Sequence, residues 1–238
     1  MTYDEYPPPP DLAASVKAFW TLDGSGAPGE WIEHQAVPDG CVEIIRRLSG
    51  RSQWNGEQPA MFVAGMADRP ATFRISGDAR FAAIRLWPWA WPYLSPIEPE
   101  AMWDRWLPML EPELAVLADL LPDFEAAGTW LNTRLPPLGL GEVILSSTSV
   151  AEIRTRTGMG ARALQRWFGS NIGMSPSRYL RVLRFQKAFA QVGSEPSLAE
   201  HAAAHGFADQ AHMAREFKAL AGTPAGDARR RATGPFLH

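Results

Sequence analysis

The sequence predicts an α+β protein in which a small β-barrel or β-sandwich with flanking helices precedes an all-helical region. Short runs of strand-forming residues, separated by glycine and proline turns, occupy most of the first 98 residues. The residues from 149 onward show helical periodicity, and a short motif recurs there at a fixed offset. A chain of 238 residues is long enough for two ordinary domains.

The recurring motif consists of an apolar residue, an arginine, a phenylalanine and a glycine. Its copies are Leu164, Arg166, Phe168 and Gly173, and, 49 residues later, Met213, Arg215, Phe217 and Gly222. Fixed-offset similarity indicates two copies of one supersecondary unit. A further glycine, Gly158 or Gly206, precedes each copy and follows a helical stretch. This order is typical of a helix-turn-helix unit, whose second helix can enter the DNA major groove.

Each second helix is expected to bury one face and expose another. Residues four apart share a helix face, so Leu164 and Phe168 should pack inward, as should the equivalent pair in the second unit. Arginine, lysine and glutamine on the other face are side chains that bind base edges and phosphates. The candidate DNA-binding residues are Arg162, Gln165 and Arg166 in the first unit, Gln210, Arg215 and Lys218 in the second, and Arg178 on a helix predicted between them from Pro176 to about Val192.

This segment resembles the double helix-turn-helix DNA-binding domain of AraC/XylS-type transcription regulators. The resemblance implies a sequence-specific regulator whose two second helices dock in the major groove about one helical turn of DNA apart. The matching positions are Gly158, Leu164, Arg166, Phe168, Gly173, Ser175, Pro176, Tyr179, Arg184 and Phe185, followed by Ala202, Gly206, Phe207, Asp209, Gln210, His212, Arg215, Phe217, Lys218, Gly222, Thr223 and Pro224.

Two positions depart from the family pattern. Gly160 stands where the family usually has a serine N-cap, which should weaken the start of that helix by a few tenths of a kcal/mol. Arg154 stands where a small alanine usually packs between the two helices. Both positions fall in the first unit, so they affect the expected contribution of the first unit to base reading more than that of the second.

The charge is distributed unevenly along the chain. The net formal charge of −3 would not suggest nucleic acid as a partner. Residues 149–238, however, carry 13 Lys and Arg against 6 Asp and Glu, whereas residues 1–148 carry 10 against 20. The basic C-terminal part is typical of phosphate binding, and the acidic part is expected to face away from DNA.

The N-terminal part is predicted to hold a helix over Leu12–Trp20 and strands over 42–48, 61–65, 71–75 and 81–87. The stretches PPPPDLAASVKAFWTLDG and VPDGCVEII resemble uncharacterised cupin-like N-terminal domains attached to some AraC-type regulators. That resemblance implies a β-barrel that senses a small molecule or a partner. It does not identify the ligand.

Helices are predicted over 100–107, 113–121 and 124–135. By analogy with AraC-like proteins, Leu114, Leu117, Leu120 and Leu121 are candidates for a homodimer contact, and packing on their own barrel is the alternative. The expected organisation is a cupin-like domain over 1–98, its helical extension over 99–134, a linker over 135–148, the double helix-turn-helix over 149–231 and a tail over 232–238. The tail is expected to fray, and Arg229–Arg231 to reach phosphates.

Trp87, Trp89 and Trp91 alternate and would share one face of a strand. They are candidate ligand-binding residues in an aromatic pocket for an apolar or cationic molecule, and the alternative is a core position. Cys41 is the single cysteine. It is either a redox-responsive or alkyl-accepting thiol or, more commonly for a lone cysteine, a small buried apolar residue.

No nucleophile elbow, phosphate loop or metalloprotease motif occurs, so we expect neither an enzyme nor a cofactor. We expect no metal site, and we interpret His201 and His205 as a solvated helix face. With no signal peptide and no long apolar run, a cytoplasmic protein without membrane contact is expected. The prediction is therefore a DNA-binding transcription regulator that senses a small molecule or partner. The alternatives are a small-molecule-binding protein with a degenerate helix-turn-helix and a thiol-based regulator that uses Cys41.

Overall fold

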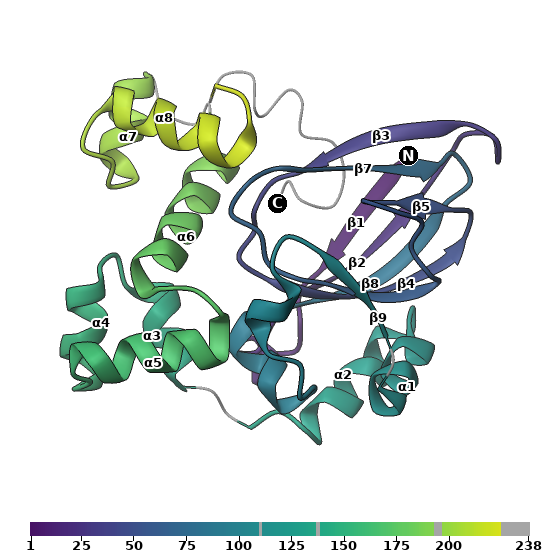
Figure 1. The fold of residues 1–238 in the computed structure, drawn as a ribbon, viewed down its shortest axis with the longest axis horizontal. Coiled ribbons are helices and arrows are strands. Elements are labelled where there is room, and N and C mark those ends of the chain that lie inside the picture. Colours follow the sequence, from purple (N-terminus) through teal and green to yellow (C-terminus); the bar gives the residue numbers. More distant parts are fainter. Residues whose placement is uncertain (110, 137–138, 193–196, 225–238) are drawn as a thin grey trace.

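The computed structural model describes residues 1–109, 111–136, 139–192 and 197–224, and it confirms the α+β class (Figure 1). Two antiparallel sheets form the N-terminal part, and helices follow them. The strands are β1 (Thr2–Tyr6), β2 (Val16–Asp23), β3 (Trp31–Ala36), β4 (Val42–Ser49), β5 (Ser52–Gln53), β6 (Met61–Ala64), β7 (Ala71–Ser76), β8 (Arg80–Leu86) and β9 (Trp106–Pro108). The helices are α1 (Pro112–Leu120), α2 (Phe124–Asn132), α3 (Gly139–Ser146), α4 (Val150–Thr157), α5 (Ala161–Ile172), α6 (Pro176–Ala190), α7 (Leu198–Ala204) and α8 (Gln210–Ala221), with short 3₁₀ helices η1 (Pro10–Leu12), η2 (Pro88–Tyr93) and η3 (Pro99–Met102).

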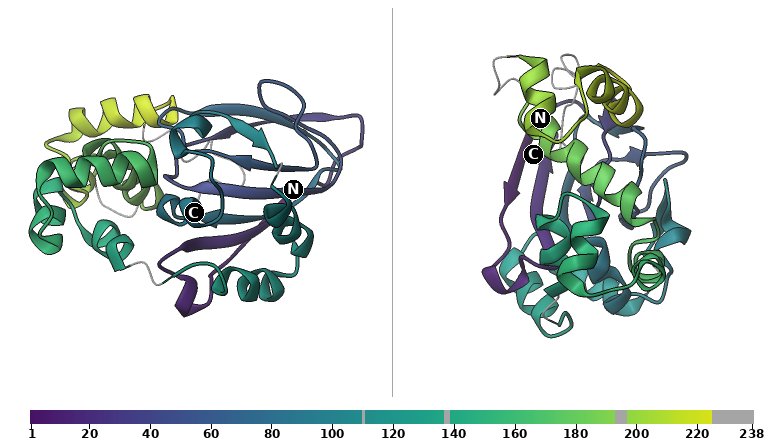
Figure 2. Two further views of the ribbon diagram at one scale, coloured as in Figure 1. Left: turned by 60° about the horizontal axis from the view of Figure 1, so that its bottom comes forward. Right: turned by 90° about the vertical axis from the view of Figure 1, so that its left-hand side faces the viewer.

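The two sheets are separate, so the N-terminal part is an open sandwich and not a closed barrel. The larger sheet has the strand order β1-β2-β8-β4-β6-β9, and the smaller has the order β3-β7-β5. All the pairings within both sheets are antiparallel. The sandwich lies at one end of the molecule, and α3–α8 lie together at the other (Figure 2).

Side chains of the larger sheet alternate between two cores because successive residues of a strand point to opposite faces. In β4, Ile45 belongs to the apolar core between the two sheets. Its neighbour Ile44 belongs to a second core, on the opposite face. In β8, Phe81 and Ile84 divide between the two cores in the same way. The central strands are therefore apolar on both faces, because both faces are covered.

The second core is formed by the larger sheet together with α1, α2 and η2. Leu114 and Leu117 of α1 are fully buried in it, as is Leu121, which follows α1. Arg46 of β4 donates hydrogen bonds to the carbonyl oxygens of Ala118, Asp119 and Leu121 at the end of α1. The leucine face proposed by analogy as a homodimer contact is thus occupied by the chain's own sandwich.

Three predicted elements are wrong. The stretch predicted as a helix over Leu12–Trp20 is η1 followed by strand β2. The stretch predicted as a helix over 100–107 contains η3 and β9, and the backbone turns at Asp104, whose φ is 51°. The alternation at Trp87–Trp91 belongs to η2 and not to the end of a strand. The strands predicted near 42–48, 61–65, 71–75 and 81–87 are present as β4, β6, β7 and β8, and the helices predicted over 113–121 and 124–135 are present as α1 and α2.

The helical region packs directly on the sandwich. The stretch predicted as a linker contains α3, whose Ile144 is buried in the same core as α1. That core continues through Trp89 and Trp91 to Phe168 of α5. Tyr179 of α6 donates a hydrogen bond to the carbonyl oxygen of Gly40 at 3.1 Å. Part of the predicted linker (137–138), Arg229–Arg231 and the tail lie outside the described residues.

Candidate nucleic-acid interface and ligand pocket

Two helix-turn-helix units are formed by α4–α5 and α7–α8, with α6 between them (Figure 1). Each unit turns at a glycine with a left-handed backbone, Gly158 with a φ of 68° and Gly206 with a φ of 71°. Other residues rarely adopt this conformation, which explains why a glycine recurs there. The first helix of each unit begins at a serine, Ser149 or Ser197, whose side chain accepts a hydrogen bond from the backbone three residues later.

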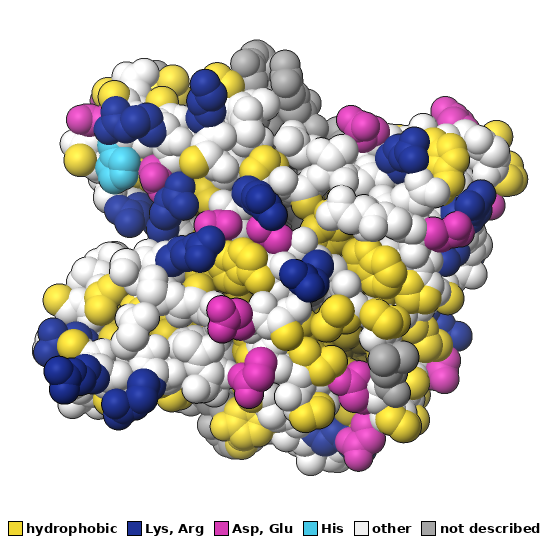
Figure 3. Space-filling view, viewed as in Figure 1, with side chains coloured by type: hydrophobic (Ala, Val, Ile, Leu, Met, Phe, Trp, Pro, Cys, Tyr) yellow, Lys and Arg dark blue, Asp and Glu magenta, His cyan; other side chains and the backbone are white. Residues whose placement is uncertain are grey.

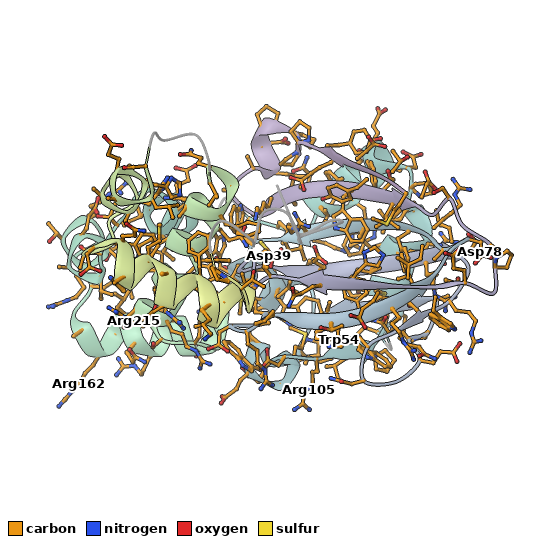
Figure 4. The ribbon with its side chains drawn as sticks, turned by 90° about the horizontal axis from the view of Figure 1, so that it is seen from above. Asp39, Trp54, Asp78, Arg105, Arg162 and Arg215 are labelled. Atoms are coloured by element: carbon orange, nitrogen blue, oxygen red, sulfur yellow. The ribbon has the colours of Figure 1, made fainter. Side chains whose placement is uncertain are left out.

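The second helices, α5 and α8, have the predicted inner and outer faces. Leu164 and Phe168 are fully buried in α5, and Met213 and Phe217 are buried in α8. The six candidate side chains Arg162, Gln165, Arg166, Gln210, Arg215 and Lys218 are all exposed. Arg162 and Arg215 lie at the end of the molecule away from the sandwich (Figure 4). None of the six forms an ion pair or side-chain hydrogen bond with the described part of the chain, so they are available to an outside partner.

Arg178, by contrast, is engaged by the N-terminal domain. Its Nε donates to Asp68 Oδ2 at 2.9 Å, and its guanidinium lies 4.4 Å from the centre of the Trp103 ring. The two other arginines on α6 also have partners inside the chain. Arg181 pairs with Glu216, and Arg184 donates to the carbonyl oxygen of Gly206 at 3.0 Å. In this conformation Arg178 is therefore occupied by the N-terminal domain, and its role in DNA binding stays a prediction.

The two departures from the family pattern differ in their structural effect. Gly160 is the N-cap of α5 and supplies no side-chain hydrogen bond, whereas Asp209 caps α8 by accepting from the His212 N–H at 2.6 Å. Gly160 is thus at the predicted N-cap position, and the weaker start of α5 stays a prediction. Arg154 is exposed on α4 and does not enter the contact between the helices. Its replacement of a small residue therefore leaves the packing of the first unit intact.

Basic side chains gather over the two helix-turn-helix units. Figure 3 shows Lys and Arg clustered over α4–α5 and over α7–α8, while acidic side chains are spread over the sandwich and the adjoining helices. The charge asymmetry seen along the sequence is thus also an asymmetry in space. A phosphate backbone would be attracted to the helical end of the molecule.

A pocket lies between the two sheets of the sandwich. Its walls are mostly apolar and aromatic, and the space they enclose, including the part open to solvent, amounts to about 830 Å³. Its aromatic lining residues are Trp20, Trp54, Phe62, Phe73 and Phe81, and its charged ones are Asp39, Glu43 and Arg69. An apolar cavity with a few polar groups is the usual form of a small-molecule site.

One side of this pocket is a buried cluster of charges around Arg85, which is fully buried on β8. Its guanidinium lies 2.8 Å from Glu43, 3.0 Å from Asp39 and 2.9 Å from Glu5, in each case to a carboxylate oxygen. Trp20 also donates to Glu43 Oε1 at 3.2 Å. Burial, opposed by Arg85 and reinforced by Asp39, raises the pKa of Glu43 to about 7.

The tryptophans proposed as ligand-binding residues do not line this pocket. Trp89 and Trp91 are buried in the other core, where their indole N–H groups donate to the carbonyl oxygens of Ala14 and Ile97. Trp87 stacks on Trp89 with ring centres 5.6 Å apart. Trp89 and Trp91 therefore occupy core positions, whereas Trp87 is only partly buried. The structure places other aromatic residues, on β2, β6, β7 and β8, around the cavity.

Cys41 lines the pocket but is almost fully buried. Burial, reinforced by the Asp39 carboxylate, raises the pKa of its thiol well above the usual range. A protonated, buried thiol is a poor nucleophile, so the geometry disfavours the thiol-based alternative.

The histidines expected on a solvated face are partly in the core. His201 is 1% exposed, and its Nε2 lies 2.9 Å from the carbonyl oxygen of Ala188, so its interpretation as a surface residue is wrong. The ring of His205 lies 4.4 Å away, centre to centre. Within the described residues, no group of three or more histidine, cysteine or acidic side chains is placed to hold a metal ion. No described helix is long and apolar enough to span a membrane.

Sequence reasoning missed Glu43 and Arg85, although a signal was present. Glu43 interrupts the apolar run of β4, and Arg85 interrupts that of β8. A charged residue inside a strand buried on both faces needs a partner, which is a reason to look for a pair. The two residues are 42 positions apart and are opposite each other in adjacent strands, so their meeting depends on strand pairing.

Comparisons with known proteins also divide the chain into an N-terminal and a C-terminal domain. A family model described as a helix-turn-helix domain matches residues 153–231, and one described as a domain of unknown function (DUF6597) matches residues 4–108. No curated protein gives a significant match.

Similar solved structures include two of ToxT from Vibrio cholerae. One is 12% identical with a TM-score of 0.49, covering 91% of this chain and 99% of that one. The other, described as bound to an unsaturated fatty acid, is 12% identical with a TM-score of 0.46, covering 91% and 95%. On the family matches and the geometry of its units, this chain joins an N-terminal domain of unknown function to a C-terminal helix-turn-helix domain of the AraC type.

Proposed function

We propose that this protein is a sequence-specific transcription regulator whose N-terminal domain senses a small molecule. The observation that carries the proposal is the pair of exposed polar faces on α5 and α8. Each helix also has a buried apolar face, and its exposed basic side chains have no ion-pair partner among the residues that the structure describes. Helices with this arrangement bind in the major groove, where arginine and glutamine read base edges.

In this proposal α5 and α8 each enter one segment of the major groove. Arg162, Gln165 and Arg166 serve the first segment, and Gln210, Arg215 and Lys218 serve the second. The helix α6 separates the two units and packs on the sandwich (Figure 1). Its position therefore determines how α5 and α8 are placed relative to each other. Double-stranded DNA is the macromolecular partner. None of the contacts described above requires a homodimer.

Sensing is assigned to the cavity between the sheets because one of its walls also contacts α6. The chain from Val37 to Cys41 lines the pocket, apart from Gly40. Within the same segment Pro38 and Gly40 accept hydrogen bonds from Gln186 and Tyr179 of α6. A ligand that changes this wall therefore has a direct physical route to the helix that joins the two DNA-binding units.

The test is binding of the purified full chain to the DNA upstream of its own gene, compared with random DNA at two salt concentrations. We expect a specificity ratio above about 10³ and an affinity that falls as salt rises. Weak binding, equal on both DNAs, would reject base reading by the ligand-free chain and favour a small-molecule-binding protein with a degenerate helix-turn-helix.

A further inference from the structure

We propose that the pocket between the sheets binds a small apolar cation, an amine or quaternary ammonium compound, with its charged nitrogen against Glu43. This inference deepens the proposed sensing role and rests on it for its biological meaning. Direct ligand binding, measured without DNA, tests it separately.

Glu43 has one carboxylate oxygen to which no described residue donates a hydrogen bond. The residue lines the pocket and is 3% exposed. Its Oε1 accepts hydrogen bonds from Arg85 and Trp20, but its buried Oε2 accepts none from the described residues. A buried carboxylate oxygen without a donor is costly, and a ligand N–H or cationic group that reached it after a small shift of its neighbours would remove the cost.

The charges at this wall of the pocket also favour a cation. Three carboxylates, from Glu5, Asp39 and Glu43, lie within 3.0 Å of the single guanidinium of Arg85. Arg85 itself does not line the pocket, and the lining cation is Arg69, whose side chain is 70% exposed and pairs with Asp104 at 2.6 Å. The pocket wall itself thus has two carboxylates, Asp39 and Glu43, and a cationic ligand would favour the ionised form of Glu43, whereas an anionic ligand would oppose it.

The remaining walls of the pocket contain several aromatic rings. Trp20, Phe62 and Phe81 come from the larger sheet, and Phe73 comes from the smaller sheet that faces it. The negative faces of aromatic rings attract ammonium groups, and a desolvated site strengthens that attraction. Carboxylate and aromatic rings together select a ligand that is both apolar and cationic, whereas the rings alone would accept any apolar molecule.

The experiment compares probes of matched size and opposite charge on the full-length protein by calorimetry and ligand-observed NMR. Tryptamine and 2-naphthylmethylammonium are the cations, indole-3-propionate and 2-naphthoate are the anions, and 3-propylindole is the neutral probe. We expect the cations to bind about tenfold or more tightly than the matched anions. Equal or tighter binding of the anions, or no binding by either cation at millimolar concentration, overturns the proposal.

Two variants assign the charge preference to Glu43. Glu43→Gln keeps an oxygen that can accept from Trp20 and removes the charge, so we expect it to lose the preference for cations over the matched anions. Asp119→Asn is the matched control, because Asp119 is an exposed carboxylate at the end of α1. Cation affinity that survives in Glu43→Gln contradicts the assignment. If Glu43→Gln does not fold, the wild-type comparison of cations and anions still decides the proposal. Failure of operator binding with intact cation binding would reject the regulator but not the ligand class.

Discussion

Replacement of Arg215 on α8 tests whether this side chain contacts a base or a phosphate. It is exposed and has no partner in the described chain, so its replacement leaves the fold unaffected. We predict that Arg215→Ala weakens operator binding by about 1–3 kcal/mol and relaxes specificity at one base pair, as expected for loss of a base contact. Competition binding on a set of single-base operator variants measures both effects.

The matched control for Arg215 is Arg105, an exposed arginine of the N-terminal domain that lies apart from Arg215 (Figure 4). Arg105→Ala removes the same charge, so it corrects for the general effect of net charge on DNA affinity. If Arg215→Ala weakens binding equally on every sequence, the arginine contacts a phosphate and does not read a base. Equal behaviour of the two variants would place Arg215 outside the interface.

Glu43 makes a prediction about pH and stability. In the folded chain the surrounding groups are Arg85, Asp39 and Trp20, and burial raises the pKa of Glu43 from 4.5 to about 7. The folded state therefore binds this proton more tightly than the unfolded state does. The resulting stabilisation is complete below about pH 4.5 and is lost as the pH rises through about 7.

Chemical denaturation of the wild type and of Glu43→Gln from pH 5 to pH 8 measures this effect. We expect the free energy of unfolding of the wild type to fall relative to that of the variant as the pH rises. A difference that stays constant across this range would show that Glu43 keeps an ordinary pKa, with Arg85 compensating fully for burial.

At the scale of elements, α5 offers a test of capping. Gly160 caps it without a side chain, and a Cβ added there meets nothing within 4 Å. We predict that Gly160→Ser raises the free energy of unfolding by a few tenths of a kcal/mol. Gly158→Ser, two residues earlier, is the contrasting control, because its φ of 68° penalises any side chain and should cost about 1 kcal/mol. Thermal unfolding of both variants measures the signs, and a stabilising Gly158→Ser would contradict this account.

The helices of the C-terminal region could be predicted because their signals are local. The turn glycines, the serine caps and the paired apolar positions of α5 all lie within one unit of sequence. The strand β2 could not be recognised in this way. It is buried on both faces between β1 and β8, so Val16 and Trp20 matched a helical spacing by coincidence. Which strands become neighbours is decided by the whole sheet.

The candidate site shows the same contrast between local signals, which could be predicted, and contacts between distant segments, which could not. The six exposed residues of α5 and α8 follow from helix periodicity alone. The pocket does not, because its lining comes from strands of two sheets that are far apart in sequence. Arg178 was assigned to DNA from its charge and helical position, and its contact with Asp68, 110 residues away, could not be anticipated.

At the scale of the whole molecule, the two regions defined by sequence share a core. Leu164, Phe168 and Ile172 of α5 belong to the same apolar cluster as Trp89 and the residues under the larger sheet. The second unit has a separate core, to which the sandwich contributes Val37. The first unit is thus built on the sandwich, while the second is held mainly by α6. A conformational change in the sandwich would therefore act on the first unit through their shared core and on the second unit mainly through α6.

This arrangement predicts that a fragment of residues 139–238 is only partly folded. Removing the sandwich exposes the buried face of α5, and each large apolar side chain exposed costs about 1.5–3 kcal/mol. The core of α6, α7 and α8 remains almost complete in the fragment. Hydrogen exchange should then show fast exchange in α5 and retained protection in α8, with the full chain as the control. Equal protection of α5 in both proteins would show that the first unit folds without the sandwich. The contacts of α5 with the sandwich would then not stabilise this helix.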